Sequence, residues 1–188
     1  IVAGFRVSDP RRLRHWMLRY HRNNFAKAIC VSTDVRSFAV KCLKFNPSRL
    51  SVIPNGVDCG HVDQCVPATA VDLGLDIEHP WLTFVGRLDY QKGVELIVQN
   101  ADEILRELPK HHILIVGEGP QRRALEREIE SQGHQDRVHF LGYRPDAISI
   151  VKASEILLHP SRWEGMPNAI MEAMAIGRPE IGRASCRE

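Results

Sequence analysis

Two carboxylates, Glu164 and Glu172, stand eight positions apart in the segment 160–175. The residue pattern there predicts a strand end, a Gly-Met-Pro turn and the start of a helix. A carboxylate accepts two hydrogen bonds at once, so it suits the vicinal hydroxyls of a ribose or a hexose. The free N–H groups in the first turn of the helix favour an anion such as a phosphate. The less specific interpretation is an acid at a helix start followed by a solvated helix position.

Two cations, Arg87 and Lys92, occupy another predicted strand-to-helix turn, and Gly86 and Gly93 flank them. A guanidinium can bridge phosphate oxygens, and an ammonium adds a mobile point charge. Glycine lets the backbone approach a ligand closely. Paired cations therefore suit a diphosphate, and together with the paired acids they indicate a nucleotide-sugar site. Taken alone, the same turn is as readily a basic surface loop.

Two weaker motifs follow later strands. Gly117 and Gly119 frame a tight turn, which is not a dinucleotide fingerprint because Arg122 takes the third glycine position. Gly142 and Tyr143 form a turn that either holds a base by backbone hydrogen bonds and stacking or merely connects two elements. His159 closes another strand, and a packing role is favoured for it over a catalytic one.

Strands and helices alternate along the chain. Each strand is nearly continuous in apolar residues, which predicts an α/β fold: a Rossmann-like parallel sheet with helices on both faces. Ligands bind such sheets at the carboxyl ends of the strands, where every motif above is expected. The predicted strands are 28–32, 50–53, 81–85, 112–116, 137–141 and 155–159, and the predicted helices are 33–44, 94–108, one from Pro120, 146–153 and 167–176.

The periodicity also divides the chain. Residues 57–80 have poor periodicity, which predicts a linker between a first domain, 1–56, and a second, 81–179. Residues 180–188 are polar and Arg-rich where an apolar strand is expected. This string resembles a translated sequencing adapter, so we interpret it as a non-native tail outside the fold. On this interpretation the chain is a fragment that starts partway through a larger protein and is cut short after Pro179.

The overall composition is that of an ordinary globular protein. The 188 residues carry a net charge of +2, which gives no general field for nucleic acid, and they contain no apolar run of transmembrane length. Five cysteines without a Cys-x-x-Cys pair or zinc spacing favour reduced thiols in a cytosolic protein and no metal site. Residues 9–27 predict a basic amphipathic helix. It either packs with a solvated basic face, the favoured reading, or lies on an anionic membrane surface.

The ordered motifs resemble those of glycosyltransferase family four, retaining enzymes of the GT-B fold with two facing Rossmann-like domains. The resemblance rests on 53–58, 84–87, 92–93, 116–120, 138–142 and 160–179. It implies that residues 1–56 are the end of an acceptor-side domain and that 81–179 form an incomplete donor domain. Neither the acceptor pocket nor a complete cleft is then present, so we expect the 188 residues alone to turn over nothing.

The resemblance also implies the role of each residue. Arg87 and Lys92 bind the donor diphosphate, Glu164 contacts the donor sugar, and Glu172 binds the ribose. The backbone of Gly165, Met166, Pro167 and Asn168 helps to hold the donor, and the Gly142-Tyr143 turn lies near the base; Gly86, Gly117 and Gly119 are counted with the donor-binding residues.

The expected activity is hexosyl transfer with retention from a UDP- or GDP-sugar, without a metal or other cofactor. The expected acceptor is a glycan or lipid-linked molecule in cell-envelope or glycolipid synthesis. The expected place is the cytoplasm, with peripheral contact at the inner face of the membrane left open. An epimerase-like GT-B enzyme and a non-catalytic nucleotide-sugar binding module are the alternatives.

Overall fold

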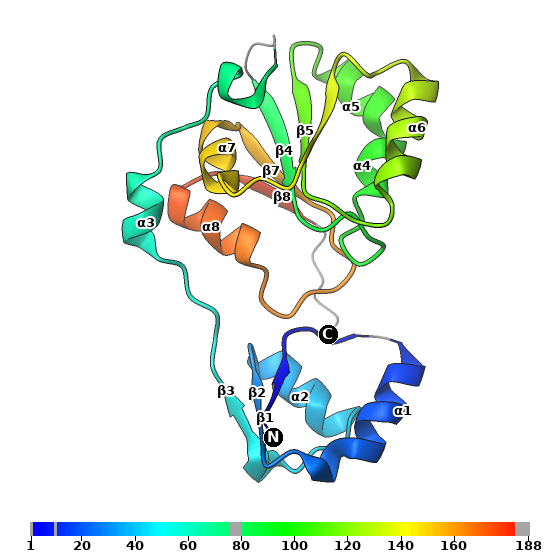
Figure 1. The fold of residues 1–188 in the computed structure, drawn as a ribbon, viewed down its shortest axis with the longest axis vertical. Coiled ribbons are helices and arrows are strands. Elements are labelled where there is room, and N and C mark those ends of the chain that lie inside the picture. Colours follow the sequence, from blue (N-terminus) through cyan, green and yellow to red (C-terminus); the bar gives the residue numbers. More distant parts are fainter. Residues whose placement is uncertain (1, 10, 76–79, 183–188) are drawn as a thin grey trace. The chain divides into compact units, whose positions relative to one another are not determined.

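The computed structural model describes residues 2–9, 11–75 and 80–182, and its contacts divide the chain into two compact units (Figure 1). Unit 1 contains Ile1–Gly56 together with Trp163–Asn168. Unit 2 contains Val57–Arg162 and the chain from Ala169 onward.

Unit 1 is built on a parallel sheet in the order β1-β2-β3. Ser32 caps helix α2, because its hydroxyl oxygen accepts a hydrogen bond from the Val35 amide at 3.2 Å. Buried Cys30, Val35, Leu43 and other apolar side chains form the core between helix and sheet. The elements are β1 (Val2–Phe5), α1 (Arg12–His21), η1 (Arg22–Asn24), β2 (Lys27–Cys30), α2 (Thr33–Lys41), η2 (Pro47–Arg49) and β3 (Leu50–Val52).

Unit 2 has a five-stranded sheet in the order β6-β5-β4-β7-β8, and all of its pairings are parallel. Its strands are β4 (Trp81–Val85), β5 (His112–Val116), β6 (Val138–Gly142), β7 (Ile156–His159) and β8 (Glu180–Gly182). Its helices are α3 (Cys59–Gln64), η3 (Val71–Leu73), α4 (Glu95–Gln99), α5 (Ala101–Glu107), α6 (Arg122–Gln132), α7 (Ala147–Ala153) and α8 (Asn168–Ile176).

Helices cover both faces of this sheet. Successive side chains of a strand point to opposite faces. Leu82 and Phe84 of β4 accordingly join the cluster formed with α4, α5 and α6, whereas Trp81 joins the cluster formed with α7. Figure 1 shows α4–α6 on one side of the sheet and α7 and α8 on the other. The predicted α/β class, a Rossmann-like parallel sheet covered on both faces, is therefore confirmed.

Most predicted elements are present, with small shifts at their ends. The continuous helix predicted over 94–108 is wrong: α4 ends at Gln99 and α5 begins at Ala101. Asn100 separates them, and its side-chain amide donates a hydrogen bond to the Leu96 carbonyl at 2.7 Å. Such side-chain bonding to the backbone competes with a regular helix. The strand β1 was not predicted.

Two other predictions need correction. Residues 57–80 are more than a linker, because the described part forms α3 and η3 and buries Val62, Ala68 and Leu73. The Lys152 ammonium donates hydrogen bonds to the Val62 and Cys65 carbonyls, at 2.9 and 2.8 Å, which fixes the end of α3 on unit 2.

The predicted tail, 180–188, does not lie wholly outside the fold, since Glu180–Gly182 form β8 and pair with β7. Residues 183–188 lie outside the described residues. The adapter origin of the tail stays a prediction. Among the helices of the described chain, none has both the length and the apolar character that crossing a bilayer requires.

Candidate functional site

The two predicted phosphate-binding cations lie in the connection between β4 and α4, at the carboxyl end of the sheet of unit 2. Asp89 organises this turn. Its carboxylate pairs with the Arg87 Nε at 3.1 Å and accepts a hydrogen bond from the Lys92 amide at 3.2 Å. The Arg87 side chain is 70% exposed, so its guanidinium is accessible to a ligand from solvent. One carboxylate thus holds the turn that presents both cations.

Lys92 is half-buried and leans over the end of β4. Its Cδ lies 3.6 Å from the position that a Cβ on Gly86 would take. Gly93 follows with a φ of +68°, and a Cβ there would stand 2.4 Å from the Pro160 carbonyl oxygen. Glycine is therefore required at position 93, both for its left-handed backbone and for its close approach to the segment that follows β7.

Gly117 and Gly119 allow the loop after β5 to pack closely against the loop after β4 at the same end of the sheet. A Cβ on Gly117 would lie 1.9 Å from the Gly86 carbonyl oxygen, and one on Gly119 would lie 2.2 Å from that of Leu88. The Leu88 amide donates a hydrogen bond to the Glu118 carbonyl at 2.9 Å. These glycines allow the loop after β5 to support the loop that carries Arg87.

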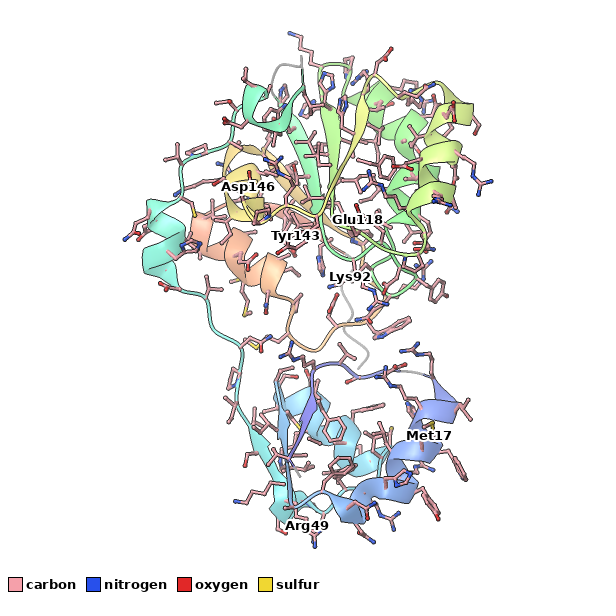
Figure 2. All side chains as sticks on the ribbon, viewed as in Figure 1. Met17, Arg49, Lys92, Glu118, Tyr143 and Asp146 are labelled. Carbon is pink, nitrogen blue, oxygen red and sulfur yellow. The ribbon has the colours of Figure 1, made fainter. Side chains whose placement is uncertain are left out.

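The turn after β6 joins the same cluster of loops. The Gly117 amide donates a hydrogen bond to the Gly142 carbonyl at 2.7 Å. Tyr143 follows with its side chain 76% exposed, so its ring is accessible for stacking. Figure 2 shows Lys92, Glu118 and Tyr143 at the end of unit 2 where β4, β5 and β6 end.

Arg122 stands at the start of α6, beside this turn. It forms ion pairs with Glu118 and Glu126, which raise the pKa of its guanidinium. Two carboxylates thus pair with Arg122, whereas the carboxylate of Asp89 pairs with Arg87.

Glu172 lies on α8 of unit 2. Its side chain is half-buried beside the buried Ala173, and burial raises the pKa of its carboxyl group above the ordinary value. A carboxylate held partly away from water gains more from a ligand hydroxyl than an exposed one does. The alternative of a fully solvated helix position is therefore wrong.

The segment from Glu164 to Asn168 packs with unit 1. Gly165 pairs with Val7 in an antiparallel bridge, and a Cβ on Gly165 would stand 2.0 Å from the Arg6 carbonyl oxygen. Met166 packs against the core cluster of unit 1. Pro167 lies in the same segment, directly before α8.

Asn55 fixes the end of this segment. Its side-chain amide donates hydrogen bonds to the Met166 carbonyl and to the Asn168 Oδ1, each at 3.0 Å. The turn at Pro54-Asn55-Gly56 was predicted, but this second role was not.

The structure therefore groups the predicted residues as two sets. Arg87, Lys92, Glu172 and the glycine turns belong to unit 2, and Glu164–Asn168 belong to unit 1. The prediction that all of them surround one crevice stays a prediction. Within the described ranges no group of three or more His, Cys, Asp or Glu side chains is arranged to hold a metal ion.

The parallel sheet, the loops at its carboxyl end and the cation turn define a Rossmann-like domain of the GT-B type. The family profile "Glycosyl transferases group 1" matches residues 79–187, and "Glycosyltransferase Family 4" matches residues 2–61. The chain belongs to the group 1 glycosyl transferases, and the resemblance to family four is confirmed.

Two curated relatives indicate the range of the family. An Escherichia coli UDP-Gal:alpha-D-GlcNAc-diphosphoundecaprenol alpha-1,3-galactosyltransferase is 32% identical over 96% of this chain and 49% of its own length. An alpha-D-kanosaminyltransferase of Streptomyces kanamyceticus is 35% identical over 94% of this chain and 46% of its own. The chain thus spans about half the length of these relatives.

The solved structures support the fold. Anabaena Alr3699/HepE, crystallised with UDP and glucose, aligns with a TM-score of 0.77 over 96% of this chain and 52% of its own, at 20% identity. At that identity the likeness shows the GT-B fold alone.

Proposed function

We propose that the whole protein transfers a hexose from a nucleotide diphosphate sugar to an acceptor, with retention of the anomeric configuration. The single observation that carries this proposal is the Arg87-Asp89-Lys92 turn at the carboxyl end of the sheet in a chain of this family. The turn presents two cations where a parallel α/β sheet binds its ligand.

The proposed chemistry needs charge stabilisation at the leaving group. The bond between the anomeric carbon and the diphosphate oxygen breaks, and negative charge develops on that oxygen. The Arg87 guanidinium and the Lys92 ammonium stabilise this charge, which removes the need for a metal ion or other cofactor. The acceptor oxygen attacks the same face of the sugar, and the departing phosphate takes the acceptor proton.

The remaining residues bind and orient the donor. Glu172 accepts hydrogen bonds from the ribose hydroxyls, and Tyr143 lies near the base. Glu164 contacts hydroxyls of the donor sugar, and the backbone of 165–168 holds the donor. Removal of the ribose interaction weakens ground-state binding, whereas removal of Arg87 or Lys92 lowers the rate of the chemical step.

The donor we propose is a UDP- or GDP-sugar, and the acceptor is a glycan or a lipid-linked molecule of cell-envelope or glycolipid synthesis. The E. coli relative is named for UDP-galactose and a diphosphoundecaprenol acceptor, and the HepE crystal contains UDP, which supports a uridine donor first. We further propose a cytoplasmic protein that acts at the inner face of the membrane.

The test is calorimetric titration of the full-length protein with UDP- and GDP-sugars, followed by NMR of the product anomer. Tight binding of one donor and a product with the configuration of the donor support the proposal. Inverted product contradicts retention. A product altered at a sugar carbon without any acceptor supports the epimerase alternative, and donor binding with neither transfer nor hydrolysis supports the binding module.

A further inference from the structure

Strand β6 forms one edge of the sheet of unit 2. Among the described strands it pairs with β5 alone, and in Figure 1 it is the yellow arrow beside β5. An edge strand presents backbone amides and carbonyls that no neighbouring strand occupies. The free edge of β6 is therefore a place where another extended chain can join the sheet.

The contact with β5 shows which backbone groups of β6 point outward. The Ile113 amide of β5 donates a hydrogen bond to the Arg137 carbonyl at 2.8 Å. Successive carbonyls of a strand point to opposite sides, so those of Val138 and Phe140 are directed away from β5. The amides of these two residues share that direction, because in a parallel pair the amide and the carbonyl of one residue lie on the same side.

Two of these four outward groups already have partners. The Val138 amide donates a hydrogen bond to the His134 carbonyl at 2.9 Å. The Phe140 carbonyl accepts a long hydrogen bond from the Arg122 Nη2 at 3.4 Å. Within the described chain this leaves the Val138 carbonyl and the Phe140 amide, one acceptor and one donor, for an added strand.

A cavity of about 400 Å³, here called the β6 groove, lies along this edge. Phe140 and Ile129 belong to the apolar cluster on the α6 side of the sheet, whereas Leu141 and Leu75 belong to the cluster on the α7 side. All four line the cavity. The groove therefore extends around the edge of the sheet and offers apolar contacts on both faces. Its volume lies within the usual range of ligand sites, about 300–1,000 Å³.

The charged side chains of the groove are acidic. Glu126 and Glu130, one turn apart on α6, line it, and no lysine or arginine of the described chain does. Glu126 pairs with Arg122 at 2.8 Å, whereas Glu130 is exposed and no described cation pairs with it. His139 also lines the groove, and burial lowers the pKa of its imidazole, so it adds no charge at neutral pH. A complementary ligand is therefore positively charged beside its apolar groups.

We propose that the β6 groove binds an extended peptide of a partner protein in which basic and apolar residues alternate. The peptide adds a strand to the edge of the sheet, so main-chain hydrogen bonds supply affinity and alternate side chains supply specificity. Its apolar side chains occupy the cavity, and a lysine or arginine pairs with Glu130.

The available backbone groups select the direction of the added strand. An antiparallel strand bonds both the amide and the carbonyl of one residue, but Val138 and Phe140 each have one of these groups already bonded. A parallel strand bonds the carbonyl of one residue and the amide of the residue two positions on. The peptide residue opposite His139 therefore donates to the Val138 carbonyl and accepts from the Phe140 amide.

The experiment is fluorescence polarisation of the full-length protein with short labelled peptides. The first peptide alternates lysine and valine, the second alternates glutamate and valine, and the third is the lysine–valine peptide with every backbone nitrogen methylated. The first should bind at least about tenfold more tightly than the others, because the second has the wrong charge and the third cannot donate to the Val138 carbonyl. No binding of the lysine–valine peptide, or equal binding of its methylated form, overturns the proposal.

The variant Glu130→Lys tests the acidic wall of the groove. It should bind the lysine–valine peptide about fivefold more weakly, because an attractive ion pair becomes a repulsive one. Its denaturation midpoint should not change, since Glu130 is exposed. The matched control is Glu128→Lys on the same helix, which does not line the groove and should bind the peptide as the unchanged protein does. Equal peptide affinity of the two variants contradicts the proposed site.

Hydrogen exchange locates the contact. The amide of Phe140 faces outward in the free protein, so the lysine–valine peptide should slow exchange in the segment 138–142. The methylated peptide should leave that exchange unchanged. Protection by the lysine–valine peptide that spares 138–142 assigns the contact elsewhere and refutes strand addition at β6.

A second copy of the chain at this edge has its own outcome. If light scattering shows self-association that Glu130→Lys abolishes, and the lysine–valine peptide does not compete with it, the groove is an interface between copies and the proposal is wrong. Nucleotide-sugar titration without peptide tests the transferase proposal by itself, because neither Glu130 nor Phe140 is among the proposed donor-binding residues. Glu130→Lys should accordingly keep its donor affinity.

Discussion

The Arg162 guanidinium forms an ion pair with the Glu95 carboxylate, 67 positions away, and connects the segment after β7 with the first residue of α4 at the carboxyl end of the sheet. It also donates a hydrogen bond to the Tyr90 carbonyl at 2.9 Å and lies over the Tyr90 ring at 4.0 Å. The Arg162 backbone amide donates a hydrogen bond to the Gln91 carbonyl at 2.8 Å. Arg162, which lies in the segment after β7, therefore holds the turn that contains Lys92.

Arg162→Met should destabilise unit 2 by about 1–3 kcal/mol, because it leaves the Glu95 carboxylate without its cation at a site where that side chain is only 14% exposed. It should also weaken donor binding several-fold, since the Lys92 turn loses its support. Urea denaturation and calorimetric titration measure the two effects. Arg106→Met is the control, because the ion pairs of Arg106 with Asp102 and Glu107 are exposed.

A double variant separates positioning from stability. Glu95→Gln combined with Arg162→Met removes the unpaired charge, so much of the stability should return. Donor affinity should stay low, since the turn is still not held. Full recovery of affinity with stability would show that Arg162 has a structural role only.

Arg87→Met and Lys92→Met, made singly in the full-length enzyme, should each lower kcat about 10²–10³-fold, as loss of one preorganised charge at a developing anion does. Fold stability should change little for Arg87, whose side chain is mostly exposed. Arg123→Met, an exposed arginine on α6, is the control. Retention of full turnover by both variants would contradict the proposed diphosphate site. Glu164→Ala should also reduce transfer severely, as measured by kcat of the full-length enzyme.

The sequence was sufficient for β4, β5, β6 and β7 of unit 2, because these strands are nearly continuous apolar runs, whereas the residues of β8 were interpreted as part of the tail. Both β4 and β5 have the predicted bounds, and hydrophobic periodicity carries that information locally. The strand β1 was missed because Val2-Ala3-Gly4-Phe5 is short and contains a glycine. The residues of α3 and η3 give too few turns for a periodic signal.

The sequence allowed us to predict which residues belong to the candidate site, but not the hydrogen bonds and ion pairs that hold them. Motifs at strand ends predicted that Arg87 and Lys92 lie at the carboxyl end of the sheet, and the structure places both in the turn after β4, whereas their binding of a donor stays a prediction. The Asn55–Met166 bond and the Arg162–Glu95 pair span 111 and 67 positions, and no local pattern signals them. Gly117 and Gly119 were counted with the donor-binding residues. In the structure the absence of a side chain at each position makes room for a neighbouring backbone, and contact with a donor stays a prediction.

Gly119→Ala tests that close approach. An added Cβ would meet the Leu88 carbonyl oxygen at 2.2 Å, and backbone on both sides leaves little room to relax. The variant should lose about 1–3 kcal/mol of stability. Gly4→Ala is the matched control, because no heavy atom lies within 4 Å of the Cβ that it would gain. Equal denaturation midpoints for the two variants would contradict the packing argument.

The His112–His139 pair predicts a pH dependence of stability. The Nδ1 of His112 and the Nε2 of His139 are 3.1 Å apart on neighbouring strands. Burial lowers the pKa of both imidazoles, Arg137 adds to the effect at His112, and Asp136 opposes it at both residues.

The direction follows from proton linkage. Below the unfolded pKa of about 6.5 the unfolded chain binds protons that the folded chain excludes. Stability should therefore be complete above that pH and fall as the pH drops toward the lowered folded values. Urea denaturation from pH 8 to pH 5 should show this slope, and His139→Gln should reduce it. An unchanged slope in the variant would assign the pH dependence to other groups.

Glu172→Gln should separate stability from function. Because burial raises the pKa of Glu172, the ionised carboxylate opposes folding above that pKa. The neutral amide removes this cost, so the variant should be as stable as the unchanged protein or more stable at pH 7. It should bind the donor nucleotide about tenfold more weakly, because charge-assisted hydrogen bonds to the ribose are lost.

Glu103→Gln, an exposed position on α5, should change neither quantity. Calorimetric titration with UDP and with uracil tests the contact between Glu172 and the ribose, since only UDP carries the ribose. An unchanged affinity of the variant for UDP would show that Glu172 is not part of the site, whatever its effect on stability.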